Sequence, residues 1–335
     1  MLRPSNVGTG VRIVEWLRDN GAAGLVSDVE AIYYSVNAPG TGGAALTTLP
    51  KVGAGEIADG SYAPARIPPA VTPALAGEGV WQGTGPLVAG APPVLVTTFR
   101  PDPNYPQLVA GVAWIDTSRA SLALYPGRYE PPGAGSQLAE VPPALRSQLL
   151  ATFNAGFKLE DSGGGFFAGG RSYAPLRDGQ ATLIAYRDRR VDVALWTGGP
   201  VPGADVLFAR QNLPLILSGG RLNPNLGDGP EWGATLGNAV RVWRSAVGVD
   251  ARGNLLYAAA DLQTASSIAQ ILQRAGAVRA MELDINSEWV TFNSYRGWGA
   301  FGAQKLLPDM TRDVTRYLSP DDRDFFAVYA RVSSG

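Results

Sequence analysis

The chain is organised around Gly276-Ala-Val-Arg-Ala-Met-Glu-Leu-Asp-Ile-Asn-Ser-Glu-Trp289, a short apolar strand that runs out into a dense polar tip. The tip carries four carboxylate or carboxamide side chains, those of Glu282, Asp284, Asn286 and Glu288. Just upstream, residues 254–260 are predicted to form another strand, and residues 264–274 a helix that Gly276 ends as a C-cap. Such a strand, helix, strand unit makes parallel strands and places ligand sites beyond their carboxyl ends, where Asp284 lies.

The rest of the predicted sheet is rich in hairpins. Residues 181–196 contain two apolar runs around a charged turn at 187–190, and residues 245–260 contain two more around a turn at 250–253. Further strands are expected over residues 94–99, 108–115, 121–125 and 324–331. Hairpins combined with one helical crossover predict an α+β fold, namely a mixed β-sheet with hairpins, at least one βαβ crossover, and helices packed on the sheet.

Three segments are predicted along the chain. Residues 1–36 show helical spacing near 11–17 and again near 25–33, and are expected to form an N-terminal helical segment. Residues 37–90 are rich in Gly, Ala, Pro and Thr and have little periodicity, which is typical of a connecting segment. Residues 91–335 carry the predicted sheet and are expected to form the main domain.

Composition limits the function. The 335 residues are 45% hydrophobic and 17% charged, as in soluble globular proteins, and a net charge of -1 gives no basic excess for binding nucleic acid. The chain has no histidine and no cysteine, so Ser-His and Cys-His catalysis and imidazole or thiolate metal sites are excluded. Any catalysis must use carboxylates, Arg, Lys, Tyr, hydroxyl groups or backbone amides.

The carboxylates of the central stretch are the first candidates for chemistry. Strand alternation places Glu282 and Asp284 on one face and Met281 and Leu283 on the other. Because the apolar face indicates an interior strand, carboxylates on the opposite face are unfavourable unless that face lines a cleft. Close carboxylates divide into an acid and a base when their environments separate their pKa values, as glycosidic bond cleavage requires. The alternative is a solvated strand end.

A divalent cation is a second interpretation of the same carboxylates. The EF-hand pattern is not met, because Trp289 stands at its glycine position and Tyr295 at the position of its bidentate glutamate. No cofactor and no metal ligand are therefore assigned, and a divalent cation stays an open alternative.

A glycine-rich segment supplies further candidates. Asn154-Ala-Gly-Phe-Lys158 follows an apolar run, and two glycine clusters come next, the second just before Arg171. Glycines let backbone amides approach an anionic or sugar ligand, and Lys158 or Arg171 could neutralise a phosphate. Arg244, at the start of another predicted strand, is a weaker candidate. The alternatives are that the glycine-rich segment is a flexible surface loop and that Arg244 is a surface arginine without a specific role.

Four motifs, in this order along the chain, resemble the phosphodiester glycosidase family. Asn154-Ala-Gly-Phe157 is similar to the Asn-Gly-Gly-Phe-Phe of the family, and Gln211-Asn-Leu-Pro-Leu-Ile-Leu-Ser-Gly-Gly-Arg221 to its segment that ends in a glycine turn. Arg244-Ser-Ala-Val-Gly-Val-Asp250 resembles Arg-Thr-Ala-Ile-Gly-x-Asp. Gly276-Ala-Val-Arg-Ala-Met-Glu-Leu-Asp284 resembles the Gly-Ala-x-x-Ala-x-x-Leu-Asp that precedes Gly-Gly-Gly-Ser.

The resemblance implies an activity and roles for three residues. The family cleaves a sugar 1-phosphodiester, releasing the sugar and leaving a phosphomonoester. By resemblance, residues 91–335 are a phosphodiester glycosidase-like catalytic domain in which Asp284 is the leading catalytic carboxylate. Arg244 is then the phosphate or sugar clamp, and Asn154 is a ligand-orienting amide.

The resemblance also implies a location. It is strongest to actinobacterial envelope members of the family, which tend to carry an N-terminal membrane anchor, so the protein is expected to be extracytoplasmic, either secreted or membrane-anchored. No run of about 18 apolar residues is present to span a membrane, and no export signal is visible at the start of this sequence, so the anchor is expected to be absent from it.

The chain departs from the family immediately after Asp284. Where the family has Asp-Gly-Gly-Gly-Ser, this sequence has Asp284-Ile-Asn-Ser-Glu288, which replaces bare backbone with bulky and charged side chains. Three consequences are open. The substrate differs, or catalysis is reassigned to Asp284 with Glu288 or Glu282, or the activity is lost.

The sequence thus predicts a glycosidase-type hydrolase of a sugar 1-phosphodiester or related cell-envelope glycan, with a carboxylate acid/base mechanism. The predicted catalytic residues are Asp284, Glu282 and Glu288. The predicted substrate-binding residues are Asn154, Lys158, Arg171, Arg244, Asn286 and Trp289. The expected partner is a carbohydrate or sugar-phosphate substrate. The alternatives are a non-catalytic cell-wall glycan-binding protein, whose tryptophans would stack on sugar rings, and a metal-dependent phosphodiesterase.

Overall fold

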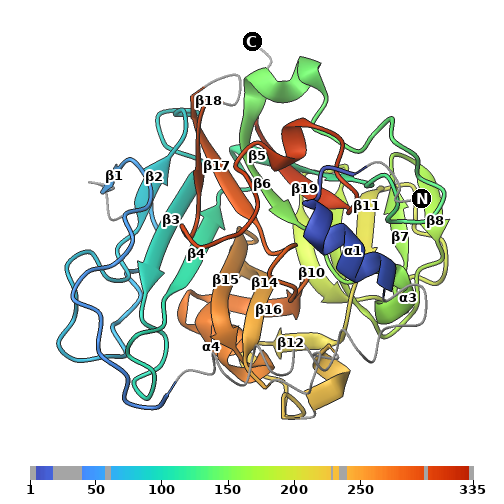
Figure 1. The fold of residues 1–335 in the computed structure, drawn as a ribbon. Helices are drawn as coiled ribbons and strands as arrows, with labels where there is room; N and C mark the ends of the chain where they lie inside the picture. Colours follow the sequence, from blue (N-terminus) through green and yellow to red (C-terminus); the bar gives the residue numbers. More distant parts are fainter. Residues whose placement is uncertain are drawn as a thin grey trace.

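The structure of the protein is a computed structural model that describes residues 5–17, 40–56, 62–227, 229–233, 240–297 and 301–331. Within these ranges the strands form three sheets, and every pairing between named strands is antiparallel (Figure 1). The helices described are short, and the architecture is mostly β.

The largest sheet has nine strands and contains the central stretch of the sequence. In spatial order its strands are β1 (Gly55–Glu56), β2 (Gln82–Thr84), β3 (Val94–Phe99), β4 (Ala110–Ile115), β15 (Leu255–Gln263), β14 (Val242–Asp250), β16 (Ala277–Glu282), β12 (Leu215–Ser218) and β13 (Arg221–Leu222). β16 lies inside this sheet, between β14 and β12, and its side chains are buried on both faces at its carboxyl end.

Two five-stranded sheets complete the fold. The β19 sheet contains, in order, β18 (Phe301–Lys305), β17 (Phe292–Gly297), β6 (Leu149–Asn154), β19 (Phe325–Ala330) and β5 (Ala120–Tyr125). The β11 sheet contains β10 (Val191–Leu195), β9 (Ala181–Tyr186), β11 (Val206–Gln211), β7 (Phe166–Ala168) and β8 (Arg171–Ala174).

Aromatic side chains join the three sheets into one core. Phe153 of the β19 sheet lies 5.3 Å, between ring centroids, from Tyr257 of the nine-stranded sheet, and 5.0 Å from Phe326. Phe326 in turn lies 5.7 Å from Phe208 of the β11 sheet. All four rings are buried, so large apolar surfaces from each sheet are removed from water at the same place.

The opposite face of the nine-stranded sheet is covered by α4 (Ala265–Arg274). The helix begins with a capping box, in which Thr264 and Ser267 each accept a hydrogen bond from the other's backbone N–H. Ile268, Ile271 and Leu272 are buried against the sheet, as their helical spacing predicts. Gly276 follows with a φ of 98°, a left-handed conformation that favours glycine after a helix end.

The predicted α+β fold class is wrong. The structure consists of three antiparallel sheets, and the other described α-helices, α1 (Thr9–Leu17) and α3 (Leu159–Ser162), do not form a layer on a sheet. One crossover does exist, since β15 and β16 both pair antiparallel with β14 and so run parallel to each other, with α4 between them in sequence. All hydrogen-bonded neighbours are antiparallel, and antiparallel strands that follow each other in sequence can be joined by short turns without a helix.

Several local predictions agree with the structure. The strand expected over 94–99 is β3, the hairpin expected over 181–196 is β9 with β10, and the one over 245–260 lies within β14 and β15. The helix expected near 11–17 is α1, whereas the one near 25–33 lies outside the described residues. The three-segment division of the chain stays a prediction. No helix in the described ranges has the length and apolar content needed to cross a bilayer.

Candidate active site

β16 brings two carboxylates to the interior of the molecule. Glu282 is its last residue and is fully buried, and Asp284 follows two residues later with 4% of its surface exposed. Met281 and Leu283, which alternate with them, are buried in the main core. The predicted alternation therefore holds, and the face opposite the core is also closed to solvent.

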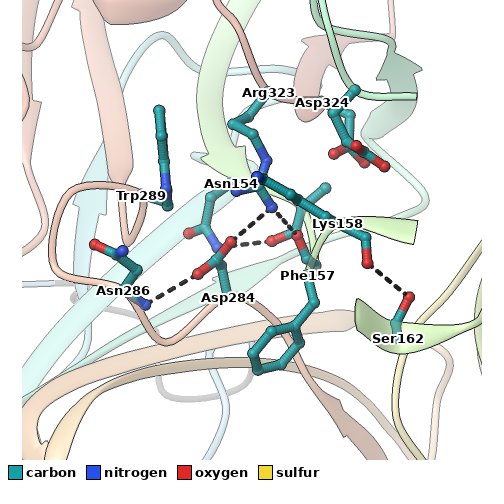
Figure 2. Close-up of polar contacts among 12 residues, drawn as sticks. Asn154, Phe157, Lys158, Ser162, Asp284, Asn286, Trp289, Arg323 and Asp324 are labelled. Carbon is teal, nitrogen blue, oxygen red and sulfur yellow. Dashed lines mark hydrogen bonds and ion pairs between the residues drawn. The ribbon is translucent and has the colours of Figure 1, made fainter. Parts of the chain in front are cut away.

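Asp284 accepts hydrogen bonds on both carboxylate oxygens. Oδ1 accepts from the backbone N–H of Asn286 at 2.9 Å, and Oδ2 accepts from Nη2 of Arg323 at 2.9 Å. Figure 2 shows Asp284 between these two donors. Its main chain is also held, because its N–H donates to the carbonyl of Ala155 and its carbonyl accepts from the hydroxyl of Ser245. Main chain and side chain are thus both fixed.

Opposing influences act on the pKa of Asp284. Burial raises this pKa above its ordinary value, and it is the largest influence. The charge of Arg323, the N–H of Asn286 and the charge of Arg316 lower it, while the negative charge of Asp324 raises it. The net direction is upward, and among the cations Arg323 opposes it most.

Glu282 forms a separate ion pair on the nine-stranded sheet. Its Oε1 is paired with Nη1 of Arg244, which also donates from Nη1 to the carbonyl of Trp232 and from Nε to the carbonyl of Gln263. Within the described residues, Oε2 of Glu282 is buried and has no hydrogen-bond partner. Burial raises the pKa of Glu282 to about 7, against the lowering effect of Arg244 and with a further rise from Asp284.

The turn after Asp284 is built from side-chain to backbone hydrogen bonds. The Asn286 side-chain oxygen accepts from the N–H of Glu288 at 2.9 Å, and the Asn286 carbonyl accepts from the N–H groups of Trp289 and Val290. Asn and Asp side chains stabilise turns in this way. Asn286 therefore shapes the turn, and Glu288 lies partly exposed at its outer side.

Trp289 is buried among arginines. Three guanidinium carbons lie near its ring centroid, at 5.1 Å for Arg316, 5.2 Å for Arg323 and 5.5 Å for Arg312. Cations near the face of an indole are attracted by its electron density. With 3% of its surface exposed, Trp289 packs against these arginines and has little surface left for stacking on a sugar.

The segment before β19 joins the three sheets at the site. Arg323 donates from Nη2 to Asp284, after β16, and also to the carbonyl of Gly156, after β6, at 3.0 Å. The adjacent Asp324 accepts from Nε of Arg210, on β11, at 2.7 Å. Two neighbouring residues therefore connect the ends of strands from all three sheets.

Comparison with known proteins identifies the domain. The phosphodiester glycosidase family model matches residues 147–284, from just before β6 to the candidate aspartate. Residues 147–284 are a phosphodiester glycosidase domain. The predicted resemblance is confirmed over these residues, and the actinobacterial subgroup stays a prediction. The family is one of glycosidase-type hydrolases that act on sugar phosphodiesters.

Solved structures give weaker likenesses. A zebrafish N-acetylglucosamine-1-phosphodiester α-N-acetylglucosaminidase catalytic domain, auto-inhibited by its pro-peptide, is 16% identical, with 75% of this chain and 88% of that chain covered and a TM-score of 0.48. A hypothetical protein from Synechocystis is 14% identical, with 74% and 64% covered and a TM-score of 0.42. Comparison with curated protein sequences gives no match.

Asn154 of the phosphodiester glycosidase domain is used within the protein. Its Nδ2 donates to the hydroxyl of Ser245 and to the carbonyl of Ala155, and its Oδ1 accepts from the hydroxyl of Tyr257 and from the N–H of Thr291. Ser245 donates in turn to the carbonyl of Asp284. Asn154 thus fixes the ends of strands around Asp284, and its carboxamide is occupied in this structure.

The two predicted cations of the glycine-rich segment lie nearer the surface. Lys158 is half-buried just before α3, and its Nζ lies 3.7 Å from Glu160 Oε1. Arg171 is exposed on β8 and stacks on Tyr173 at 4.5 Å, with a hydrogen bond to the carbonyl of Gly133. The phosphodiester glycosidase domain therefore brings Glu282, Asp284 and Arg244 into its interior and leaves Arg171 outside.

The sequence interpretation missed Arg323 and its neighbours. The signal that could have found them is the run Asp321-Asp-Arg-Asp324, four charged residues directly before an apolar strand. These residues are buried, and Asp321 accepts from Nε and Nη2 of Arg316. In the described part of the chain, no group of three or more Asp or Glu side chains is arranged to hold a metal ion.

Proposed function

We propose that this protein is an active hydrolase that cleaves the glycosidic C–O bond of a sugar 1-phosphodiester or related cell-envelope glycan. The supporting observation is the buried pair of carboxylates at the end of β16, within the residues that match the family. Acid/base chemistry needs two carboxyl groups in different environments, and Glu282 and Asp284 have different hydrogen-bond partners.

Roles are proposed for the nearby residues. Asp284 is the catalytic acid/base, and Glu282 or Glu288 assists it. Arg244 and Lys158 compensate negative charge on the substrate, and the partly exposed side of the 286–288 turn is the side from which substrate reaches Asp284. Arg244 now holds Glu282, so its contact with a substrate requires that this ion pair rearrange. We further propose an extracytoplasmic location, since the substrate is an envelope glycan.

The test is product formation. The protein is incubated with a nitrophenyl sugar phosphodiester and with cell-wall polymer, and released reducing ends and phosphomonoester are measured. Wild type and the control Asp188→Asn, which changes an exposed aspartate on the β9–β10 turn, should release product. Asp284→Asn should not. Release by Asp284→Asn at the wild-type rate contradicts the assignment.

A non-catalytic glycan-binding protein is the second candidate. It is favoured by the closed state of Asp284, whose two oxygens are both occupied and which is 4% exposed. Binding of wall polymer without any release of reducing ends selects this candidate. A chelator arm in the same assay separates both from a metal-dependent phosphodiesterase, which loses activity when the cation is removed.

A further inference from the structure

The two buried carboxylates differ in how many donors hold them. Asp284 has a donor on each oxygen, whereas Glu282 has Arg244 on one oxygen and, among the described residues, nothing on the other. An ionised carboxylate only accepts hydrogen bonds, while a protonated one must place an O–H on one oxygen. The surroundings of Asp284 therefore suit the ionised form, and those of Glu282 leave an oxygen free to carry a proton.

We propose that Arg323 is a positioning residue that holds Asp284 as the ionised member of the carboxylate pair, so that Asp284 acts as the base in the proposed reaction. The step rests on the proposed function. The C–O bond between the anomeric carbon and phosphate breaks, and its electron pair stays on the phosphate oxygen. Water adds to the anomeric carbon, and the proton that water loses passes to Asp284. The leaving phosphomonoester needs no proton at this step, so atoms and charges balance.

Arg323 is itself held in place, as a positioning residue must be. Its backbone N–H donates to Asp321 Oδ1 at 3.0 Å, and its guanidinium reaches both Gly156 and Asp284. Its main chain packs against Gly127, where an added Cβ would lie 2.5 Å from the carbonyl carbon of Arg323. Figure 2 shows the guanidinium beside Asp284, with Trp289 on the same side. A group fixed before substrate arrives costs no reorganisation during the reaction.

Other charges facing Asp284 do not replace Arg323. Arg316 is a second cation on the same side, but its guanidinium is held by Asp321 through two hydrogen bonds. Of the other carboxyl groups, Asp324 is paired with Arg210 and Glu282 with Arg244, so neither of these two arginines is available to Asp284. In the described chain, Arg323 is the cation in direct contact with the Asp284 carboxylate.

The test measures the protonation of Asp284 directly. Protein labelled with carbon-13 at aspartate carboxyl carbons is titrated by NMR, with Asp284→Asn used to assign the resonance. Arg323→Gln should raise the pKa of Asp284 by at least about one unit, since a contacting cation lowers a carboxyl pKa by roughly 1–3 units. Arg323→Lys should raise it less. The matched control is Arg128→Gln, which removes a charge from Asp322 beside Arg323 and should leave the Asp284 pKa unchanged.

An unchanged Asp284 pKa in folded Arg323→Gln overturns the proposal. If Arg323→Gln does not fold, Arg323→Lys carries the test, because lysine loses the fixed fork of donors, and an unchanged value in that variant overturns the proposal equally. The activity arm follows kcat/KM against pH. The limb that rises with pH should move upward in Arg323→Gln by the same amount as the NMR pKa, and Arg323→Lys should restore part of the shift. A limb that stays in place overturns the base role.

The two proposals fail in different ways. If no sugar phosphodiester or wall glycan is hydrolysed by wild type, yet the Asp284 pKa rises in Arg323→Gln, the proposed function is wrong and the control of Asp284 by Arg323 stands. If wild type is active and the Asp284 pKa does not respond, the function stands and the role of Arg323 is wrong.

Discussion

Glu282 at the end of β16 and Asp284 two residues later are each paired with an arginine, and the two pairs differ in their surroundings. Glu282 and Arg244 belong to a single sheet and lie within it, and one oxygen of Glu282 has no hydrogen-bond partner in the described chain. Asp284 and Arg323 meet where three sheets converge, and both oxygens of Asp284 are bonded. The same two types of charged group therefore produce two different carboxyl environments.

The comparison indicates that one arginine partner offsets the effect of burial on a carboxyl only in part, since the pKa of Glu282 stays raised beside Arg244. Burial is the largest influence on both groups and favours the neutral form. What differs is the number of N–H groups that each carboxylate receives, because hydrogen bonds to the charged form stabilise it. Each of the following predictions removes one part of this contrast.

The largest expected effect is on turnover in Asp284→Asn. The amide cannot take up a proton as a carboxylate does, so kcat/KM on a sugar phosphodiester should fall by ~10³-fold. The amide oxygen can still accept a hydrogen bond from Arg323, and Arg323 keeps its hydrogen bond to the carbonyl of Gly156. The variant should therefore remain folded, as measured by circular dichroism. A fall of less than about tenfold would place the chemistry elsewhere.

The next largest effect is on stability in Arg244→Met. This change leaves Glu282 buried without its cation and should lower the free energy of unfolding by about 3–5 kcal/mol near pH 8, where the carboxyl is ionised. Urea unfolding measures it. The loss should shrink in acid, where Glu282 is protonated and needs no partner. An equal loss at both pH values would show that packing and not charge is responsible.

Glu282→Gln should change how stability depends on pH. The pKa of Glu282 is raised from 4.5 to about 7 on folding, so its contribution is present below pH 4.5 and is lost as the pH rises through about 7. The wild type should therefore lose about 3 kcal/mol relative to Glu282→Gln across this window. Urea unfolding of both proteins near pH 5 and near pH 8 checks it. Parallel stabilities would mean that Glu282 titrates normally.

The smallest effect is expected at an exposed arginine. Arg171 contacts the ring of Tyr173 and a carbonyl but forms no ion pair within the described residues. Arg171→Ala should change the free energy of unfolding by less than about 0.5 kcal/mol. The urea midpoint gives the value, and a loss as large as that of Arg244→Met would remove the distinction between buried and exposed arginines.

Local sequence patterns predicted the strands better than the fold class. Apolar runs bounded by prolines and charged turns predicted β3 and the β9–β10 hairpin, because strand spacing and turn chemistry are properties of a few adjacent residues. The number of sheets is decided by which strands pair, and β6 and β19, which are far apart in sequence, are neighbours. No local pattern records such a pairing, so three antiparallel sheets were read as one mixed sheet.

In the candidate site, too, local features were predictable from the sequence and long-range contacts were not. Alternation along β16 indicated that Glu282 and Asp284 share a face away from the core residues Met281 and Leu283. The pairing of Glu282 with Arg244 depends on the β14–β16 register, and that of Asp284 with Arg323 spans 39 residues. Neither contact follows from residues near each other in sequence.

The position of β19 has a consequence for synthesis of the protein. It is an inner strand of its sheet, between β6 and β5, yet it follows all other described strands along the chain. While the ribosome makes the chain, β5 and β6 wait without their shared partner, and Arg323 is not available to Asp284. The candidate site is therefore assembled only after translation has passed residue 330. Until then β5 and β6 each have an unpaired edge in the nascent chain, and such edges are prone to aggregation.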